Sequence, residues 1–130
     1  FIFLAKIMSP YGEKLAEFIK RKSLQQKKFA EEIGVLPNHV SQVINGVKGP
    51  FNLITQEKIN LALKLTSQEC EELSRLSEIS GRTFRLPEES DPIRYQIAAL
   101  LCDKTHTNVD SLIEIARLAL ANYSATAEYR

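Results

Sequence analysis

Apolar residues recur along most of the chain at intervals of three and four positions, the spacing that gives an α-helix one apolar face. Alternation with a period of two does not persist anywhere, so signals for strands are nearly absent. The spacing predicts helices over about residues 10–22, 25–33, 37–45, 53–65, 67–80, 92–104 and 109–123. The chain is therefore predicted to have an all-α fold.

Short polar signals mark where several of these helices begin and end. Ser9 before Pro10 and Asp91 before Pro92 each pair a capping residue with a proline at the first helical position. Thr66 and Glu69 have the spacing of a capping box. The residues expected to be buried are Tyr11, Leu15, Phe18, Ile19, Phe29, Ala30, Ile33, Val40, Val43, Ile44, Ile59, Ala62, Leu63, Leu73, Leu76 and Ile79.

A polar connector over residues 82–90 divides the chain into two helical regions. We expect an N-terminal apolar arm over residues 1–8, a domain over residues 9–85 and a C-terminal helical extension over residues 86–130. The arm is short and has neither a basic lead-in nor a cleavage site, so it is not expected to be a secretory signal. It is expected to pack as an arm or as an edge strand in a dimer.

Composition and charge narrow the function classes. The chain is 44% hydrophobic and 25% charged, which is ordinary for a globular protein. Its net charge is only +1, but residues 1–50 carry eight Lys/Arg and four Asp/Glu, so the basic charge is concentrated in the front half. No run of 18 apolar residues is present, so no membrane partner is expected. Cys70 and Cys102 are expected to be reduced, packed thiols in a cytoplasmic protein, with a single disulfide as the alternative.

The segment Leu24–Pro50 carries the candidate chemistry. It predicts two short helices around a turn that begins at Gly34, where a left-handed residue is needed. The outward face of the second helix is expected to present polar side chains that are not acidic, namely Asn38, His39, Gln42 and Asn45. Asn and Gln amides offer a donor beside an acceptor, which matches the edge of adenine in the major groove.

A basic cluster lies close to this segment in the sequence. Its members are Lys20, Arg21, Lys22, Lys27 and Lys28. Such a cluster can neutralise phosphates, and it can equally be a solvated helix end beside a solvated helix face. The sequence leaves both interpretations open.

Several positions of the segment coincide with a known pattern: Gln26, Phe29, Ala30, Gly34, Val35, Val40, Val43, Asn45 and Gly46. With these residues the segment resembles the helix-turn-helix of the lambda-repressor/Cro family of phage and bacterial regulators. The resemblance implies a five-helix DNA-binding domain over about residues 10–81. It does not extend to the segment after about Leu86, where helical spacing alone predicts a two-helix C-terminal extension. It departs from the family at Gln25, where a threonine cap is usual, and at Ile44, where an acidic residue is common. Ser23 with Gln26 offers an alternative capping box for the second helix.

Roles for individual residues follow from the resemblance and from the basic cluster. Base contacts are implied for Pro37, Asn38, His39 and Gln42. Phosphate contacts are implied for Gln26, Asn45 and Lys48 by the resemblance, and are expected for Lys27 and Lys28 from their charge.

The last predicted helix, over residues 109–123, is apolar on most of its surface, which is typical of a helix buried on two sides. We expect a homodimer that uses the C-terminal helices. The residues expected at the dimer interface are Ile97, Leu101, Leu112, Ile113, Ala116 and Leu120. Burial within the monomer is the alternative.

The sequence therefore predicts a DNA-binding transcriptional regulator. We expect a repressor of phage or mobile-element type that binds double-stranded DNA at a palindromic operator as a dimer. The alternatives are an antitoxin whose C-terminal helices hold a protein partner, and a protein-binding adaptor that keeps the fold without binding DNA. We expect no enzymatic activity and no cofactor or metal, because His39 and His106 are far apart and no nucleophile or metal motif is present.

Overall fold

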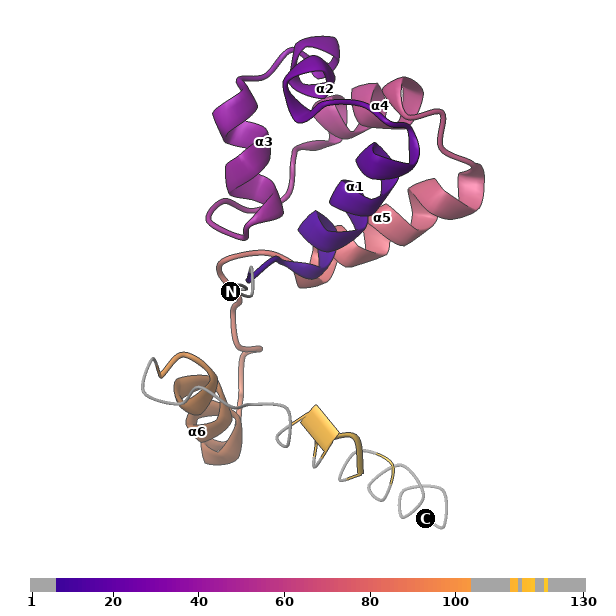
Figure 1. The fold of residues 1–130 in the computed structure, drawn as a ribbon. Helices are drawn as coiled ribbons and strands as arrows, with labels where there is room; N and C mark the ends of the chain where they lie inside the picture. The colour runs from indigo at the N-terminus through magenta and orange to yellow at the C-terminus, as the bar shows by residue number, and fades with distance from the viewer. Residues whose placement is uncertain (1–6, 104–112, 115, 119–120, 122–130) are drawn as a thin grey trace. The chain divides into compact units, whose positions relative to one another are not determined.

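The computed structural model describes residues 7–103, 113–114, 116–118 and 121. The chain divides into two compact units, Phe1–Phe84 (unit 1) and Arg85–Arg130 (unit 2), which we describe separately (Figure 1). Unit 1 contains α1 (Pro10–Arg21), α2 (Gln26–Ile33), α3 (Pro37–Ile44), α4 (Leu53–Ala62) and α5 (Ser67–Ile79), and unit 2 contains α6 (Pro92–Leu101). Within the described residues the regular structure is all helical, as predicted.

The capping signals predicted at Ser9 and Thr66 are confirmed. The backbone N–H of Gly12 donates to Ser9 Oγ at 2.9 Å, and Pro10 is the first residue of α1. In the capping box of α5, Glu69 N–H donates to Thr66 Oγ1 at 3.2 Å and Thr66 N–H donates to Glu69 Oε1 at 2.9 Å. These bonds satisfy backbone donors that a helix start otherwise leaves unpaired.

Each of the first four helices is followed, within two residues, by a residue with left-handed backbone conformation. Gly34 (φ 75°) and Gly46 (φ 74°) close α2 and α3, and glycine adopts this conformation without steric cost. Ser23 (φ 57°) and Lys64 (φ 50°) close α1 and α4 in the same way. Because Ser23 closes α1, it does not cap α2; Gln25 stands at that position without a side-chain cap, and the alternative capping box is not formed.

The core of unit 1 lies between its five helices. Helix α1 packs against α5 and α3, and α2 packs against α3 and α4 (Figure 1). The buried apolar residues are Tyr11, Leu15, Phe18, Ile19, Phe29, Ala30, Ile33, Val40, Val43, Ile44, Phe51, Ile59, Leu63 and Leu73. Helix α3 is therefore held from two sides by apolar contacts.

Gly12 is the point of closest approach between α1 and α3. A Cβ atom at this position would lie 2.2 Å from the carbonyl oxygen of Ile44 and 2.7 Å from its Cα. Both contacts are with backbone atoms, which cannot rotate away as a flexible side chain can. Only glycine fits this crossing, and it sets how closely the end of α3 lies against α1.

The prediction that Ile79 is buried is wrong, because 53% of its surface is exposed. Ser80 lies two helical turns after Leu73 and so takes the inward position at this end of α5. Its Oγ accepts a hydrogen bond from Tyr11 N–H at 2.9 Å and donates to the Leu76 carbonyl at 2.6 Å. A buried hydroxyl thus joins the end of α5 to the start of α1, and Ile79 turns outward.

In unit 2, Asp91 caps α6 as predicted, accepting a hydrogen bond from Arg94 N–H at 3.0 Å. The helix ends at Leu101, earlier than expected. Cys102, which follows it, is exposed, so its prediction as a packed thiol is wrong; Cys70 in unit 1 is half-buried, and both thiols are free. No helix of the described residues combines the length and the apolar character needed to cross a membrane.

Candidate functional site

The candidate site is centred on α3, a helix of two turns. Its N-cap residue, Leu36, has an extended backbone and makes no side-chain capping bond. Pro37 holds the first helical position, and Val40, Val43 and Ile44 anchor the inner face in the core. The opposite face is consequently turned away from the core of unit 1.

That outer face is polar. Asn38 and Asn45 are exposed, whereas Gln42 between them is half-buried. Positions four and seven residues apart lie along one side of a helix, so these three amides form a single row, which we call the amide row. The side chain of Gln42 makes no hydrogen bond with any described residue, and Asn45 makes only a long one, from Nδ2 to Ser41 Oγ at 3.5 Å. The amide row therefore retains most of its donors and acceptors for another molecule.

His39 was predicted to lie on the outward face of α3. In the structure it lies at the edge of the amide row and is only partly exposed. Its ring is half-buried against Phe51, with ring centroids 5.0 Å apart and an angle of 55° between the planes. This tilted contact joins α3 to the segment that leads into α4. The structure thus gives His39 a packing role in addition to any contact outside the chain.

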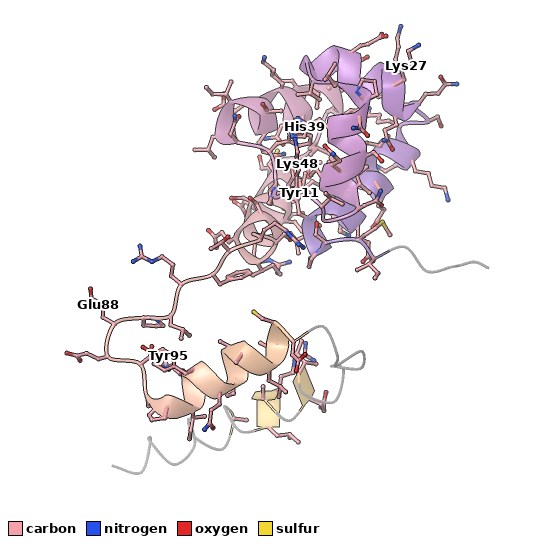
Figure 2. The ribbon with its side chains drawn as sticks, turned by 90° about the vertical axis from the view of Figure 1, so that its left-hand side faces the viewer. Tyr11, Lys27, His39, Lys48, Glu88 and Tyr95 are labelled. Atoms are coloured by element: carbon pink, nitrogen blue, oxygen red, sulfur yellow. The ribbon has the colours of Figure 1, made fainter. Side chains whose placement is uncertain are left out.

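The loop after α3 folds back onto the helix. The backbone N–H groups of Val47 and Lys48 both donate to the Gln42 carbonyl, at 2.9 and 3.1 Å. The turn passes through left-handed Gly46, where a Cβ would lie 3.5 Å from the backbone nitrogen of Ser9. Lys48 is exposed, and Figure 2 shows it with His39 in a view of the side on which α3 lies.

The predicted phosphate-contacting residues of α2 are all exposed. Gln26 is the first residue of α2, and Lys27 and Lys28 follow it. Neither lysine forms an ion pair with a described residue. Figure 2 shows Lys27 at one end of unit 1, well apart from His39 and Lys48. The structure therefore places Lys27 away from the amide row and does not gather all the predicted site residues in one patch.

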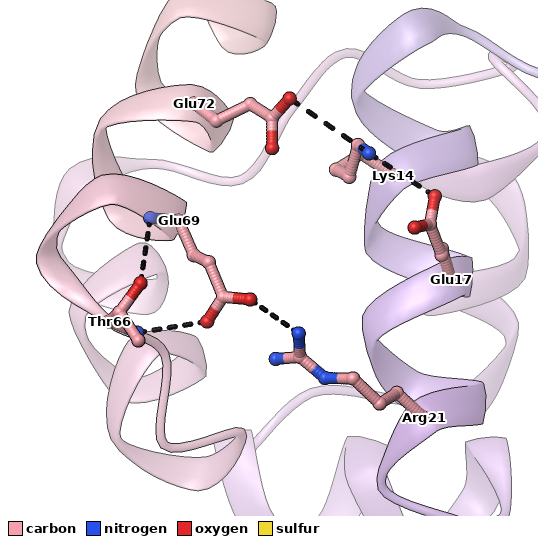
Figure 3. A network of polar contacts seen from close by, with 6 residues as sticks. All are labelled: Lys14, Glu17, Arg21, Thr66, Glu69 and Glu72. Atoms are coloured by element: carbon pink, nitrogen blue, oxygen red, sulfur yellow. Dashed lines mark hydrogen bonds and ion pairs between the residues drawn. The ribbon is translucent and has the colours of Figure 1, made fainter.

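The basic cluster predicted from the sequence is divided in the structure. The guanidinium of Arg21 donates to Glu69 of α5 (Figure 3). It also lies over the Phe18 ring, 4.8 Å from its centroid. Hydrogen bonds from Arg21 and then from the Thr66 backbone lower the pKa of Glu69 to about 2. Lys14 is similarly engaged, with Glu17 at 3.2 Å and Glu72 at 3.9 Å. Arg21 is thus a structural residue of the α1–α5 contact.

Tyr11 connects α1 to α4 beneath this surface. It is fully buried, its hydroxyl donates to Gln56 Oε1, and burial raises its pKa despite an opposing backbone hydrogen bond with Phe51. The neutral phenol therefore acts as a fixed hydrogen-bonding group that helps to position the helices around α3.

Sequence reasoning missed two residues of this region. Leu36 lies directly before the amide row, and 75% of its surface is exposed. It occupies the N-cap position of α3, where an apolar side chain cannot form a capping bond. Gly12 was not recognised because its close contact with Ile44 depends on how two helices cross. An apolar residue at an N-cap position was the sequence signal that could have drawn attention to Leu36. No neighbouring residue in the sequence marks Gly12.

The residues predicted for dimerisation lie in unit 2. Ile97 and Leu101 on α6 are 52% and 58% exposed, Ile113 is 58% exposed and Ala116 is exposed. Leu112 and Leu120 lie outside the described residues, as do His106 and residues 1–6 of the predicted arm.

Comparison of the sequence with protein-family models and with curated proteins finds no match. In the described part of the chain, no group of three or more His, Cys, Asp or Glu side chains is arranged to hold a metal ion.

Proposed function

We propose that this protein is a sequence-specific DNA-binding regulator whose α2 and α3 act as a helix-turn-helix of the lambda-repressor type. In this proposal α3 enters the major groove and Asn38 and Gln42 read base edges. Pro37 and His39 contact bases at the side of the helix. The observation that carries the proposal is the amide row, which is turned outward from a helix anchored by three buried residues.

The chemistry of the surface favours DNA over other partners. An amide can donate and accept at once and so forms bidentate pairs with adenine, each providing about 1–3 kcal/mol of discrimination. No acidic residue lies on α3, so phosphates are not repelled there. A surface for a protein partner typically has an apolar centre, which the amide row lacks.

Phosphate contacts are proposed around this face. Asn45 ends the amide row and Lys48 follows it, whereas Gln26, Lys27 and Lys28 form a separate exposed group on α2. The lysines lack ion pairs with described residues and are exposed, so little desolvation opposes their approach to phosphates. Arg21 is excluded from this role because it is engaged with Glu69.

We further propose that the protein acts as a homodimeric repressor through unit 2. The exposed Ile97, Leu101, Ile113 and Ala116 provide apolar surface for a second copy. Leu112 and Leu120, which lie outside the described residues, are assigned to this interface from the sequence alone. A two-fold dimer would place its reading helices about 34 Å apart, one turn of DNA, on a palindromic site.

Selection of binding sites from a random DNA pool tests the proposal directly. We expect a palindromic consensus. Gln42→Ala should then reduce the ratio of affinities for the consensus and a scrambled duplex by on the order of 5- to 150-fold, the equivalent of about 1–3 kcal/mol. Gln68→Ala, which removes an exposed amide from α5, is the matched control and should leave the ratio unchanged.

Lys27→Ala should act differently, because a phosphate contact carries no sequence information. It should weaken binding to both duplexes equally and reduce the dependence of log affinity on log salt by about one. Unchanged discrimination by Gln42→Ala, or failure to recover any consensus, would refute the proposal and favour a protein-binding adaptor.

A further inference from the structure

The outer face of α4 carries three large apolar side chains that remain exposed among the described residues. Leu53, Ile54 and Leu61 are 82%, 70% and 79% exposed. Scattered exposed apolar residues are normal on a soluble domain, but here three large ones lie on the outer side of a helix with only ten residues, and we call them the α4 patch.

The opposite face of the same helix is already occupied. Ile59 is fully buried where α4 packs against α2, and Leu63 directly after α4 is fully buried too. An apolar surface on both sides is typical of a helix that is buried on both sides. Among the described residues of unit 1, only the inner side of α4 packs against another helix.

Two charged residues of opposite sign divide the patch. Glu57 and Lys58 lie midway between Ile54 and Leu61, both are exposed, and neither forms an ion pair with a described residue. Along the chain the order on the outer face is Ile54, Glu57, Lys58 and Leu61. In the reverse direction the order is again apolar, charged, charged and apolar, but the positive charge comes before the negative one. A surface with this property is complementary to itself.

We propose that the outer face of α4 binds the same face of a second copy of this chain, with the two helices antiparallel. When the two-fold axis passes between residues 57 and 58, Ile54 of each copy lies against Leu61 of the other. The same register brings Glu57 of each copy alongside Lys58 of the other, so both charges gain partners of opposite sign. The Lys58 ammonium lies beside Gly34 at the end of α2, 4.0 Å from the position of a Cβ there, and its flexible four-carbon stem lets it turn toward Glu57 of the second copy.

The proposed contact is small. One helix from each copy provides less surface than a standard stable interface, so the association is expected to be weak and to depend on concentration. The inference does not rest on DNA binding or on the dimer proposed for unit 2.

Disulfide trapping in the full chain tests the register. In a Cys70→Ala, Cys102→Ser background, Ile54→Cys and Leu61→Cys variants are mixed under mild oxidation. We expect the mixture to form cross-linked dimers at least about tenfold faster than either variant alone, because only unlike positions face each other across the two-fold axis. A mixture of Glu71→Cys and Glu78→Cys, which are equally separated on the exposed side of α5, should cross-link only at the background rate.

Charge exchange in the same assay tests the pairing of Glu57 with Lys58. Glu57→Lys and Lys58→Glu should each slow the mixed cross-link by about two- to fivefold, and the double exchange should restore it. Circular dichroism of each variant verifies that the fold is intact. Equal cross-linking of like and unlike positions, or single exchanges without effect, would overturn the proposal, whatever the outcome of the DNA-binding experiments.

Discussion

Replacing Gly12 with alanine tests whether the contact between α1 and α3 determines the stability of unit 1. The added Cβ would lie 2.2 Å from the Ile44 carbonyl oxygen, whereas carbon and oxygen atoms in close contact are about 3.3 Å or more apart. The backbones must therefore separate by roughly 1 Å. Such overpacking typically costs about 1–3 kcal/mol and sometimes more. Because the clash is with backbone atoms, we expect the upper part of this range, about 2–3 kcal/mol. Alanine gains only about 1 kcal/mol in helix propensity over glycine, so the clash outweighs this gain.

We expect Gly12→Ala to lower the free energy of unfolding by about 1–2 kcal/mol after this gain is subtracted. The melting temperature should fall by roughly 4–16 °C, given that 1 kcal/mol corresponds to about 4–8 °C in a domain of this size. Urea titration followed by circular dichroism measures the first quantity and a thermal scan the second.

Gly49→Ala is the matched control, because no atom lies within 4 Å of the position that its Cβ would take. This variant should be as stable as the wild-type protein or slightly more stable. If Gly12→Ala proved as stable as Gly49→Ala, the reasoning from the close helix crossing would be refuted.

Three further predictions address single residues. Arg21 and the Thr66 backbone lower the pKa of Glu69 to about 2, below its unfolded value of 4.5. The protein should therefore lose stability as the pH falls from about 4.5 toward 2. The urea midpoints of Glu69→Gln should lack this part of the pH dependence. Lys64→Gly should raise the free energy of unfolding by about 0.5–1 kcal/mol by relieving the left-handed backbone, whereas Lys64→Ala should give no such gain. If α3 reads bases, exposed Leu36 should contact a thymine methyl group. Replacing that thymine with uracil should weaken binding of the wild-type protein by about fourfold, the equivalent of about 0.8 kcal/mol. The same replacement should leave the affinity of Leu36→Ala unchanged.

Helix starts were predictable because their signals are local. Ser9, Thr66 and Asp91 each bond to a backbone N–H three residues away, so neighbouring residues alone determine the cap. The ends at Ser23 and Lys64 were not predictable in this way, because neither residue type favours a left-handed backbone. The residues that follow them, Leu24 and Leu65, are partly buried against the core, and this tertiary contact helps to stabilise the turns.

The polar face of α3 was predictable from helical periodicity, but its surroundings were not. Periodicity identifies which side of a helix is buried, and it correctly separated Val40 and Val43 from Asn38. It carries no information on residues distant in the sequence. The packing of His39 on Phe51 and the bond from Arg21 to Glu69, 48 residues away, depend on the arrangement of whole helices.

Helix α3 does not have the means to be stable by itself. It has eight residues and no side-chain cap, and isolated helices shorter than about 12–15 residues are marginal in water. Its position must therefore come from its contacts: the buried inner face, the crossing at Gly12 and the ring of His39 on Phe51. It follows that residues which never touch a partner can change the placement of the amide row. A substitution at Gly12 should reduce stability and sequence discrimination together, whereas Gln42→Ala should reduce discrimination alone, because the amide of Gln42 bonds to no described residue of its own chain.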